Sequence, residues 1–425
     1  MSRDMKHSGT DWIGEIPVQW ELAPTKRVFR GKKRIVGDEA DNYERLALTL
    51  NGVVKRDKDD NEGLQPEQFI GYQVLEKNEL VFKLIDLQNI RTSRVGLSPY
   101  TGIVSPAYII LSNSETDNRF YYYWFMDMYN RCIFNQMGDD GVRSALNIKD
   151  VLEIPLPLIA ESTRIKIASF LDRKCAEIDE MIALQEKIVE ELKAYKQSVI
   201  TEAVTKGLNP DVPMKDSEIE WIGEIPEHWN IDKIIRSFGL IGSGTTPKST
   251  DEDNFIGNIR WIQSGDINGG VMTECKNRIS EKTLHTTSAL KIYNPPFIII
   301  AMYGASVGNT SISMIDGCVN QACCVLSESH LNLEYSFNVI KSCKDFWIRK
   351  AVGGGQPNIS QDTIKSTWIP IPPKEEQEQI ASYLNTKCTE IDNLISIKLS
   401  KIDSLKEYKK SIIYEYVTGK KEVIE

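Results

Sequence analysis

The chain contains one set of segments twice, in the same order. "WIGEIPVQW" at 12–20 returns as "WIGEIPEHW" at 221–229, and "IPLP" at 154–157 returns as "IPIP" at 369–372. "ASFLDRKCAEID" at 168–179 returns as "ASYLNTKCTEID" at 381–392, and "LKAYKQSVI" at 192–200 returns as "LKEYKKSII" at 405–413. The last two repeats share one offset, 213 residues. One structural unit has therefore been duplicated, and its middle has diverged.

A long helix is expected near the end of each copy, after a proline-rich stop. Seam positions recur at alternating steps of four and three residues, which is the a/d pattern of a coiled coil. In the first copy they are Leu171, Cys175, Ile178, Ile182, Gln185, Val189, Leu192, Lys196, Val199 and Ala203. In the second they are Leu384, Cys388, Ile391, Ile395, Lys398, Ile402, Leu405, Lys409, Ile412 and Tyr416. Gly207 and Gly419 stand where the helices are expected to end.

Such a seam has to be buried against a partner, and the other copy of the helix is the simplest one. A Pro- and Asp-containing linker at 208–220 lets the chain turn back. We therefore expect antiparallel pairing of the two helices, with a pseudo-twofold axis relating the halves. In the alternative, each helix packs only on its own globular domain.

The repeats divide the chain into two variable and two helical regions. The predicted boundaries are 1–153 for a first variable domain, 154–207 for a first helical region, 208–220 for the linker, 221–368 for a second variable domain and 369–420 for a second helical region. Both variable regions mix short β-rich runs with turns, which predicts α/β globules with a mostly antiparallel or mixed sheet. The fold class is thus α+β. The aromatic run at 120–125 is interpreted as core rather than as a base-stacking platform.

Composition limits the possible functions. The net charge of −9 is unfavourable for binding nucleic acid through a large basic surface, so any DNA contact must be a local patch or be shared with a partner. Eight cysteines without a C-x-x-C pair, and only four histidines, argue for reduced thiols and against a zinc site. The longest apolar run, "FIIIAMY", is too short to span a bilayer, and a soluble cytoplasmic protein is expected.

Two stretches imitate an adenine-N6 DNA methyltransferase. "SFGLIGSGTTPKS" at 237–249 resembles a cofactor loop, and "YNPPF" at 293–297 resembles a motif that holds a flipped base. The residues after the loop lack a helical period, no acidic residue follows at the usual ribose-binding distance, and the prolines fit the start of a strand. We therefore expect no catalytic site and no metal site. A stand-alone methyltransferase remains the alternative hypothesis, and a non-DNA scaffold joining two unrelated partners is a third.

The duplicated motifs resemble those of a known family. "WIGEIPxxW", "IPLP" and "IPIPP", "EEQEQIASYL" and the "KxxEID" helix are similar to the specificity subunit of type I restriction–modification enzymes. The first copy departs locally, with "ESTRIKI" where the second has "EEQEQI". The resemblance implies that each variable domain reads one half of a bipartite asymmetric site on double-stranded DNA, while the helices set the spacer and dock two methyltransferase (modification) subunits.

The resemblance also implies restriction subunits that translocate and cut DNA. No cofactor is expected in this chain, since S-adenosylmethionine, ATP and Mg²⁺ would belong to those partner subunits.

Candidate DNA-binding residues are chosen by chemistry and by their position in loops, because Arg suits guanine, Asn and Gln suit adenine, and Lys or hydroxyl groups suit phosphate. In the first domain they are Arg91, Arg94, Gln136, Arg143 and Ser144. In the second domain they are Thr245, Thr246, Lys248, Gln263, Ser264, Tyr303, Gln356 and Asn358.

Overall fold

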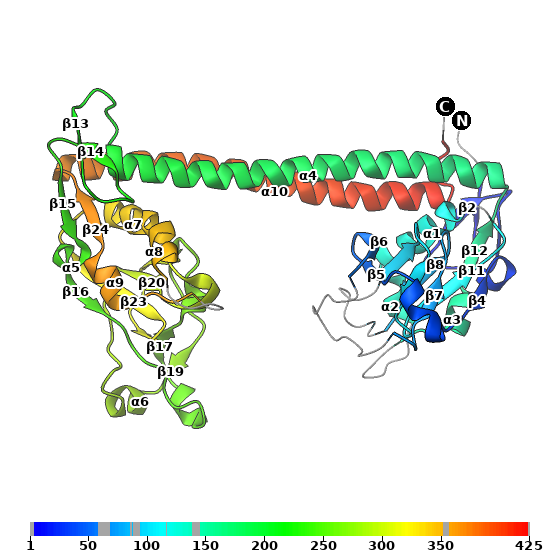
Figure 1. The fold of residues 1–425 in the computed structure, drawn as a ribbon, viewed down its shortest axis with the longest axis horizontal. Coiled ribbons are helices and arrows are strands. Elements are labelled where there is room, and N and C mark those ends of the chain that lie inside the picture. The colour runs from blue at the N-terminus through cyan, green and yellow to red at the C-terminus, as the bar shows by residue number, and fades with distance from the viewer. Residues whose placement is uncertain are drawn as a thin grey trace. The chain divides into compact units, whose positions relative to one another are not determined.

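The computed structural model describes residues 4–57, 69–85, 87, 94–115, 117–137, 145–351 and 357–423. The chain divides into two compact units, one formed by residues 1–186 with 399–425 and the other by residues 187–398 (Figure 1). Two long helices belong to both units, because each begins in one and ends in the other. We describe each unit by itself.

Unit 1 is built on a four-stranded antiparallel sheet in the order β4-β11-β8-β9. Its strands are β1 Met5–His7, β2 Glu15–Pro17, β3 Glu21–Pro24, β4 Arg30–Lys32, β5 Leu46–Thr49, β6 Gly52–Lys55, β7 Gln73–Leu75, β8 Leu80–Lys83, β9 Arg94–Leu97, β10 Gly102–Val104, β11 Ile109–Ser112 and β12 Pro155–Leu158. Its shorter helices are η1 Thr25–Arg27, η2 Gly37–Asn42, α1 Arg119–Asn130, α2 Ile133–Met137 and α3 Ile148–Glu153.

The aromatic run forms part of α1 and packs on this sheet, as expected. Phe125 meets Phe82 of β8 with ring centroids 5.0 Å apart, and Tyr121 meets Phe29 at 5.2 Å, both edge to face. Trp124 is buried and its indole N–H donates to the backbone oxygen of Pro155 (3.2 Å). The aromatic residues therefore hold the helix on the sheet instead of offering a stacking surface.

Unit 2 contains a five-stranded sheet in the order β16-β23-β20-β21-β18, in which only β18 and β21 pair in parallel. Its strands are β13 Met214–Asp216, β14 Glu224–Pro226, β15 Asn230–Lys233, β16 Phe238–Gly242, β17 Ile259–Ile262, β18 Val271–Met272, β19 Arg278–Ile279, β20 Phe297–Ala301, β21 Thr310–Ser313, β22 Cys318–Val319, β23 Cys323–Ser329 and β24 Trp368–Ile371. Its shorter helices are α5 Ile234–Ser237, η3 Glu252–Phe255, η4 Ser264–Asp266, α6 Glu281–Thr286, η5 Gly304–Ser306, α7 Leu333–Ser342, α8 Lys344–Lys350 and α9 Gln361–Ser366.

The duplication extends into the divergent middles. The order β4-β11-β8-β9 of unit 1 corresponds to β16-β23-β20-β21 of unit 2, and in each unit the helix after the sheet's last strand in sequence is followed by a second short helix. The mostly antiparallel sheets and the α+β class are thus confirmed, although the sequences of the two middles no longer align by eye.

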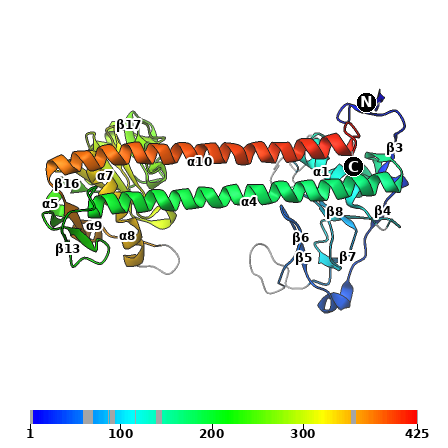
Figure 2. The ribbon, with the colours of Figure 1, turned by 90° about the horizontal axis from the view of Figure 1, so that it is seen from above.

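The long helices are α4 Glu161–Lys206 and α10 Lys374–Val417, and they run antiparallel within each unit (Figure 2). In unit 1 the rings of Phe170 and Tyr416 lie 4.3 Å apart. Every predicted seam position is buried or half-buried in its helix, so the coiled-coil prediction is confirmed. Among the described residues, no helix has the length and apolarity needed to cross a membrane.

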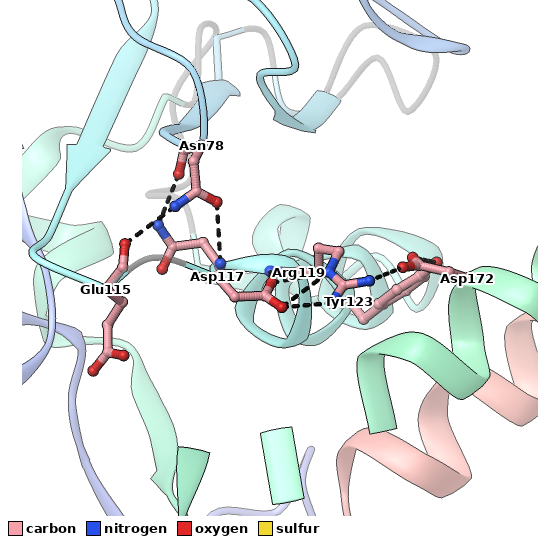
Figure 3. Close-up of polar contacts among 7 residues, drawn as sticks. Asn78, Glu115, Asp117, Arg119, Tyr123 and Asp172 are labelled. Atoms are coloured by element: carbon pink, nitrogen blue, oxygen red, sulfur yellow. Dashed lines mark hydrogen bonds and ion pairs between the residues drawn. The ribbon is translucent and has the colours of Figure 1, made fainter. Parts of the chain in front are cut away.

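A polar network attaches α4 to the domain of unit 1 (Figure 3). Asp172 of α4 accepts hydrogen bonds from Nη1 of Arg119 (2.6 Å) and from the hydroxyl of Tyr123 (2.7 Å), both on α1. Asp117 accepts from Nε of the same arginine (3.0 Å), and this hydrogen bond holds the pKa of Asp117 below its usual value. The helix is therefore oriented by charge-assisted hydrogen bonds as well as by its apolar seam.

The second copy attaches its helix at the equivalent position with different chemistry. Asn385 occupies the place of Asp172 in the repeat, and its amide donates to Oε2 of Glu334 on α7 (2.6 Å). The anchoring site is thus retained while the polar pair has changed.

Each long helix ends on a repeated tryptophan motif, at the glycine that the sequence predicts. Gly207 follows α4 with φ +75° and lies against Trp229, and Gly419 follows α10 with φ +70° and lies against Trp20 and Pro17. Because both glycines combine a left-handed backbone with close packing, other residues are disfavoured there for two reasons.

Substitution of Gly419 tests this packing. A Cβ there would lie 2.6 Å from Pro17 and 2.8 Å from Trp20, whereas Gly9 has a similar φ of +80° and open space. We expect Gly9→Ala to lower the free energy of unfolding by about 1 kcal/mol, from backbone strain alone. Gly419→Ala should cost about 1–3 kcal/mol more because of overpacking. Denaturant unfolding of both variants measures the difference, and equal losses would show that the helix end is not tightly packed.

Candidate nucleic-acid interface

Loops gather at one end of the unit 2 sheet. They follow β16, β17 and β20, they precede β23, and one leads into α9; their residues are 243–248, 263–266, 302–309, 320–322 and 357–360. Loops held together by a rigid sheet are the usual place for recognition residues.

The turn 320–322 lies at the centre of this end. The backbone N–H of Asn320 donates to the carbonyl oxygen of Ile262 (3.0 Å), and the carbonyl of Ala322 accepts from the N–H of Met302 (2.7 Å). Three strand ends are thereby joined through main-chain hydrogen bonds that do not depend on the exposed side chains.

The loop after β16 is joined to the same turn by side chains. Ser243 donates from Oγ to the carbonyl of Cys323 (2.7 Å), and Thr246 donates from Oγ1 to Oε1 of Gln321 (2.6 Å). Both Thr246 and Gln321 are exposed. The hydroxyl of Thr246 thus orients a solvent-facing amide, an arrangement suited to contacting a base edge.

Tyr303 and Asn358 are brought together although 55 positions separate them in the numbering. They form an isolated antiparallel bridge, supported by the hydrogen bond from the N–H of Gly304 to the carbonyl of Pro357 (3.0 Å). Tyr303 is 39% exposed and Asn358 is exposed. Two predicted contact residues therefore share one small surface.

The structure places the other predicted residues of unit 2 in the same set of loops. Thr245 is half-exposed and its carbonyl accepts from the indole of Trp261 (3.3 Å), and Lys248 is exposed. Gln263 and Ser264 are half-exposed at η4, where the N–H of Gln263 donates to Asp266 (2.9 Å). Gln356 lies outside the described residues.

Sequence reasoning did not select Gln321 or Asn320. Both lie in "NQACCVL", whose buried cysteines mark the start of β23, so the polar pair directly before a buried strand was the available signal.

In unit 1 the equivalent end of the sheet is basic. Arg94 is the first residue of β9 and pairs in register with Lys83, the last residue of β8. Arg45, Arg94 and Arg56 act together on Tyr108: burial raises the pKa of this phenol, and the three positive charges partly oppose that rise. The predicted residue Arg94 and its neighbour Arg56 are half-exposed and have the chemistry to contact guanine or phosphate, whereas Arg45 is buried and its guanidinium donates to the carbonyl of Asp57.

Arg45 and Arg56 were not predicted from the sequence. They stand at the two ends of the β5–β6 hairpin, and the N–H of Arg56 donates to the carbonyl of Arg45 (2.9 Å). Arginines that flank a hairpin on both sides could have drawn attention to this pair.

The remaining candidates of unit 1 are placed only in part. Gln136 is exposed on α2. Next to it, the amide of Asn135 donates to the carbonyl of Leu87. Arg91, Arg143 and Ser144 lie outside the described residues.

The methyltransferase-like stretches serve packing. A Cβ on Gly242 would overlap the hydroxyl of Tyr293, and one on Gly244 would overlap the carbonyl of Val319. Tyr293 is only 4% exposed and donates to the carbonyl of Ser243 (2.9 Å), and burial raises its pKa to about 12. Its ring is therefore part of the core and is not presented to a base.

The elements and side chains around this glycine loop also favour a packing role. The next element after the glycines is the short η3, so no helix N-terminus follows the loop to receive a cofactor phosphate or carboxylate. The described residues contain no group of three His, Cys, Asp or Glu side chains placed to hold a metal ion. Burial raises the pKa of Cys318 to about 11 and that of Cys324 to about 12, so both thiols stay neutral.

Comparisons with known proteins agree with the duplicated motifs. Residues 226–407 match the family model "Type I restriction modification DNA specificity domain". The chain is 25% identical to the putative type I restriction enzyme MjaX specificity subunit of Methanocaldococcus jannaschii, over 96% of this chain and 95% of the relative. It is 24% identical to the type I restriction enzyme EcoBI specificity subunit of Escherichia coli, over 62% of this chain and 57% of the relative.

The fold also has a solved counterpart. A chain from a structure on the assembly and conformational transition of the type I R-M system superposes with a TM-score of 0.69 and 16% identity, covering 95% of this chain and 98% of that one. The match of residues 226–407, the similarity to the MjaX relative along nearly its whole length and the shared fold all agree with the resemblance of the duplicated motifs to type I specificity subunits.

Proposed function

We propose that this chain is the sequence-specific DNA-recognition subunit of a type I restriction–modification complex. Each sheet presents one set of loops to one half of a bipartite asymmetric site on double-stranded DNA. The observation that carries this proposal is that equivalent sheet ends hold different chemistry, the basic pair Lys83 and Arg94 in unit 1 and exposed amides and hydroxyls in unit 2. One duplicated scaffold thus carries two domains that recognise different DNA sequences.

Chemistry on the DNA is assigned to other subunits. The chain has no catalytic role; its glycine loop and Tyr293 serve its own core. S-adenosylmethionine, ATP and Mg²⁺ belong to the methyltransferase and restriction subunits in this proposal, and the complex acts in the cytoplasm.

The decisive experiment maps methylated adenines across the genome with and without this gene. We expect one bipartite sequence to lose methylation when the gene is absent. If no sequence changes while the partner subunits are expressed, the proposal is wrong.

Exposed apolar side chains on the long helices support two docking sites for methyltransferase subunits. Unit 1 presents Met181, Leu184 and Tyr408, and unit 2 presents the equivalent residues Leu394, Ile397 and Tyr195, all between 43% and 62% exposed. Met181 and Tyr408 each directly precede a seam residue, and antiparallel pairing places such positions on the same flank. A flank that occurs once in each unit fits two copies of one partner.

Two substitutions on this flank test the docking. Leu184→Lys with Ile397→Lys puts a charge into each proposed interface, so we expect association with the methyltransferase subunit to weaken by about 1–3 kcal/mol per site. Pull-down and calorimetry measure this loss. Ala183→Lys with Ser396→Lys adds the same charge on the opposite flank and should bind as the parent does; equal weakening by both pairs would contradict the assignment.

Individual contacts are distinguished by the pattern of lost specificity. Gln321→Ala removes an amide, so recognition of one base position should relax by about 1–3 kcal/mol. Lys248→Ala should weaken binding to all sequences alike. It should also lower the slope of binding affinity against salt concentration by the amount of about one phosphate contact. Competition binding of the assembled methyltransferase to single-base variants separates these outcomes. A uniform loss from Gln321→Ala would make that residue a phosphate contact or a structural residue.

Helix length should set the unread spacer between the half-sites. Inserting four residues between Glu186 and Leu192 lengthens the helix by about 6 Å, which corresponds to one or two base pairs at ~3.4 Å each. We expect the methylated sequence to keep its two half-sites and to gain that spacing. The control is a matched insertion at the equivalent place in α10, between Leu399 and Leu405. An unchanged methylated sequence from a folded protein would contradict the role of the helices.

A further inference from the structure

Two lysines interrupt the apolar seam at equivalent positions. Lys196 of α4 and Lys409 of α10 differ by the repeat offset of 213 residues, and their side chains are only 20% and 31% exposed. Their aliphatic stems therefore lie within the seam, where a cation weakens apolar packing unless it finds a partner.

Each lysine finds its partner on the other helix. Nζ of Lys196 donates to both carboxylate oxygens of Asp392 (2.7 and 2.6 Å), within unit 2. Nζ of Lys409 donates to both oxygens of Asp179 (2.7 and 2.7 Å), within unit 1. The aspartates are the last residues of the repeated "CAEID" and "CTEID" segments. The two bridges are thus copies of one another under the pseudo-twofold relation.

This arrangement discriminates against parallel pairing. In a parallel alignment of the two copies in register, Lys196 would face Lys409 across the seam. The antiparallel alignment replaces this repulsive pair with two bridges, and a charged seam position is a well-attested way to specify alignment.

The bridges respond differently to a slip of one heptad. Lys409 would then face Asp172 or Glu186, so it meets a carboxylate in either direction. Lys196 would face Asn385 or Leu399 and would lose its counter-charge in either direction. Only the bridge in unit 2 therefore distinguishes the observed register from its neighbours.

We propose that the Lys196–Asp392 bridge is a register key that selects the observed alignment of α4 and α10. This inference rests on the proposed function for its consequence: a slip of one heptad displaces the helices by about 10 Å, close to three base pairs of spacer. Lys409–Asp179 selects the antiparallel direction but not the register.

Disulfide trapping measures the register of α4 against α10 in the absence of DNA. Phe170→Cys with Tyr416→Cys, in the full chain, reports the native alignment because those rings lie 4.3 Å apart. Lys196→Glu repels Asp392 in the native register and meets a neutral residue after a slip, so the trapped fraction should fall about two- to fivefold, the ratio for an exposed ion pair. The packing of Gly207 and Gly419 on the tryptophan motifs keeps the loss partial.

A variant with the two charges exchanged distinguishes loss of the Lys196–Asp392 bridge from simple misfolding. Lys196→Glu with Asp392→Lys restores the bridge with its charges reversed and should restore trapping. Lys409→Glu repels carboxylates in every register, so it should lower the unfolding temperature and leave the trapped fraction near that of the parent. Lys193→Glu, at a lysine paired with Glu190 on its own helix, is the control for charge and should change neither.

The outcomes test the register key independently of the proposed function. Unchanged trapping in Lys196→Glu, failure of the charge exchange to restore it, or an equal fall in Lys409→Glu overturns the register key while DNA recognition stands. Absence of any methylated bipartite sequence in the parent removes the proposed function, and the trapping results are unaffected. Where both hold, Lys196→Glu should also produce methylation at sites with an altered spacer.

Discussion

The structure depends on the burial of one apolar seam that neither half can cover alone. α4 and α10 each carry a mainly apolar stripe, from 171 to 203 and from 384 to 416, and such a stripe is stable in water only against a matching one. Duplication supplies the match, because a helix and its copy are complementary when they run in opposite directions. The tryptophan motifs, the anchoring networks at Asp172 and Asn385 and the glycine helix ends all serve this pairing.

The same duplication explains how two unlike surfaces arise on one scaffold. Strands β4-β11-β8-β9 and β16-β23-β20-β21 share order and direction because their inward residues form a core that tolerates little change. The loops at the sheet ends are held by main-chain hydrogen bonds, as in the turn 320–322, and their side chains are free to diverge. A basic strand end and an amide-rich surface can therefore occupy equivalent places without altering the fold.

Helices, seam, stops and domain class could be predicted from the sequence because each depends on local periodicity or on repetition. The loop residues Tyr303 and Asn358 could be chosen by chemistry, but their adjacency is tertiary and appears only as a bridge. Arg56 and Gln321 were not selected because strand pairing, which no local pattern encodes, places them at the sheet ends. "GSGTT" resembles a cofactor loop for the converse reason, because close packing and phosphate binding both require glycine, and the missing helical period after it already favoured a structural role.

The proposed role in DNA recognition can be reconciled with an acidic chain once its lysines are located. Along the long helices many are already paired on the same helix, as Lys174 is with Glu177, Lys193 with Glu190 and Lys387 with Glu390. Two more are placed in the seam as Lys196 and Lys409. Much of this positive charge is thus neutralised within one helix, while Lys196 and Lys409 bridge the two helices, so the proposed DNA contacts fall to the sheet ends. In the proposed function, a net charge of −9 means that the chain supplies few phosphate contacts by itself and that the assembled complex supplies most of the affinity for DNA.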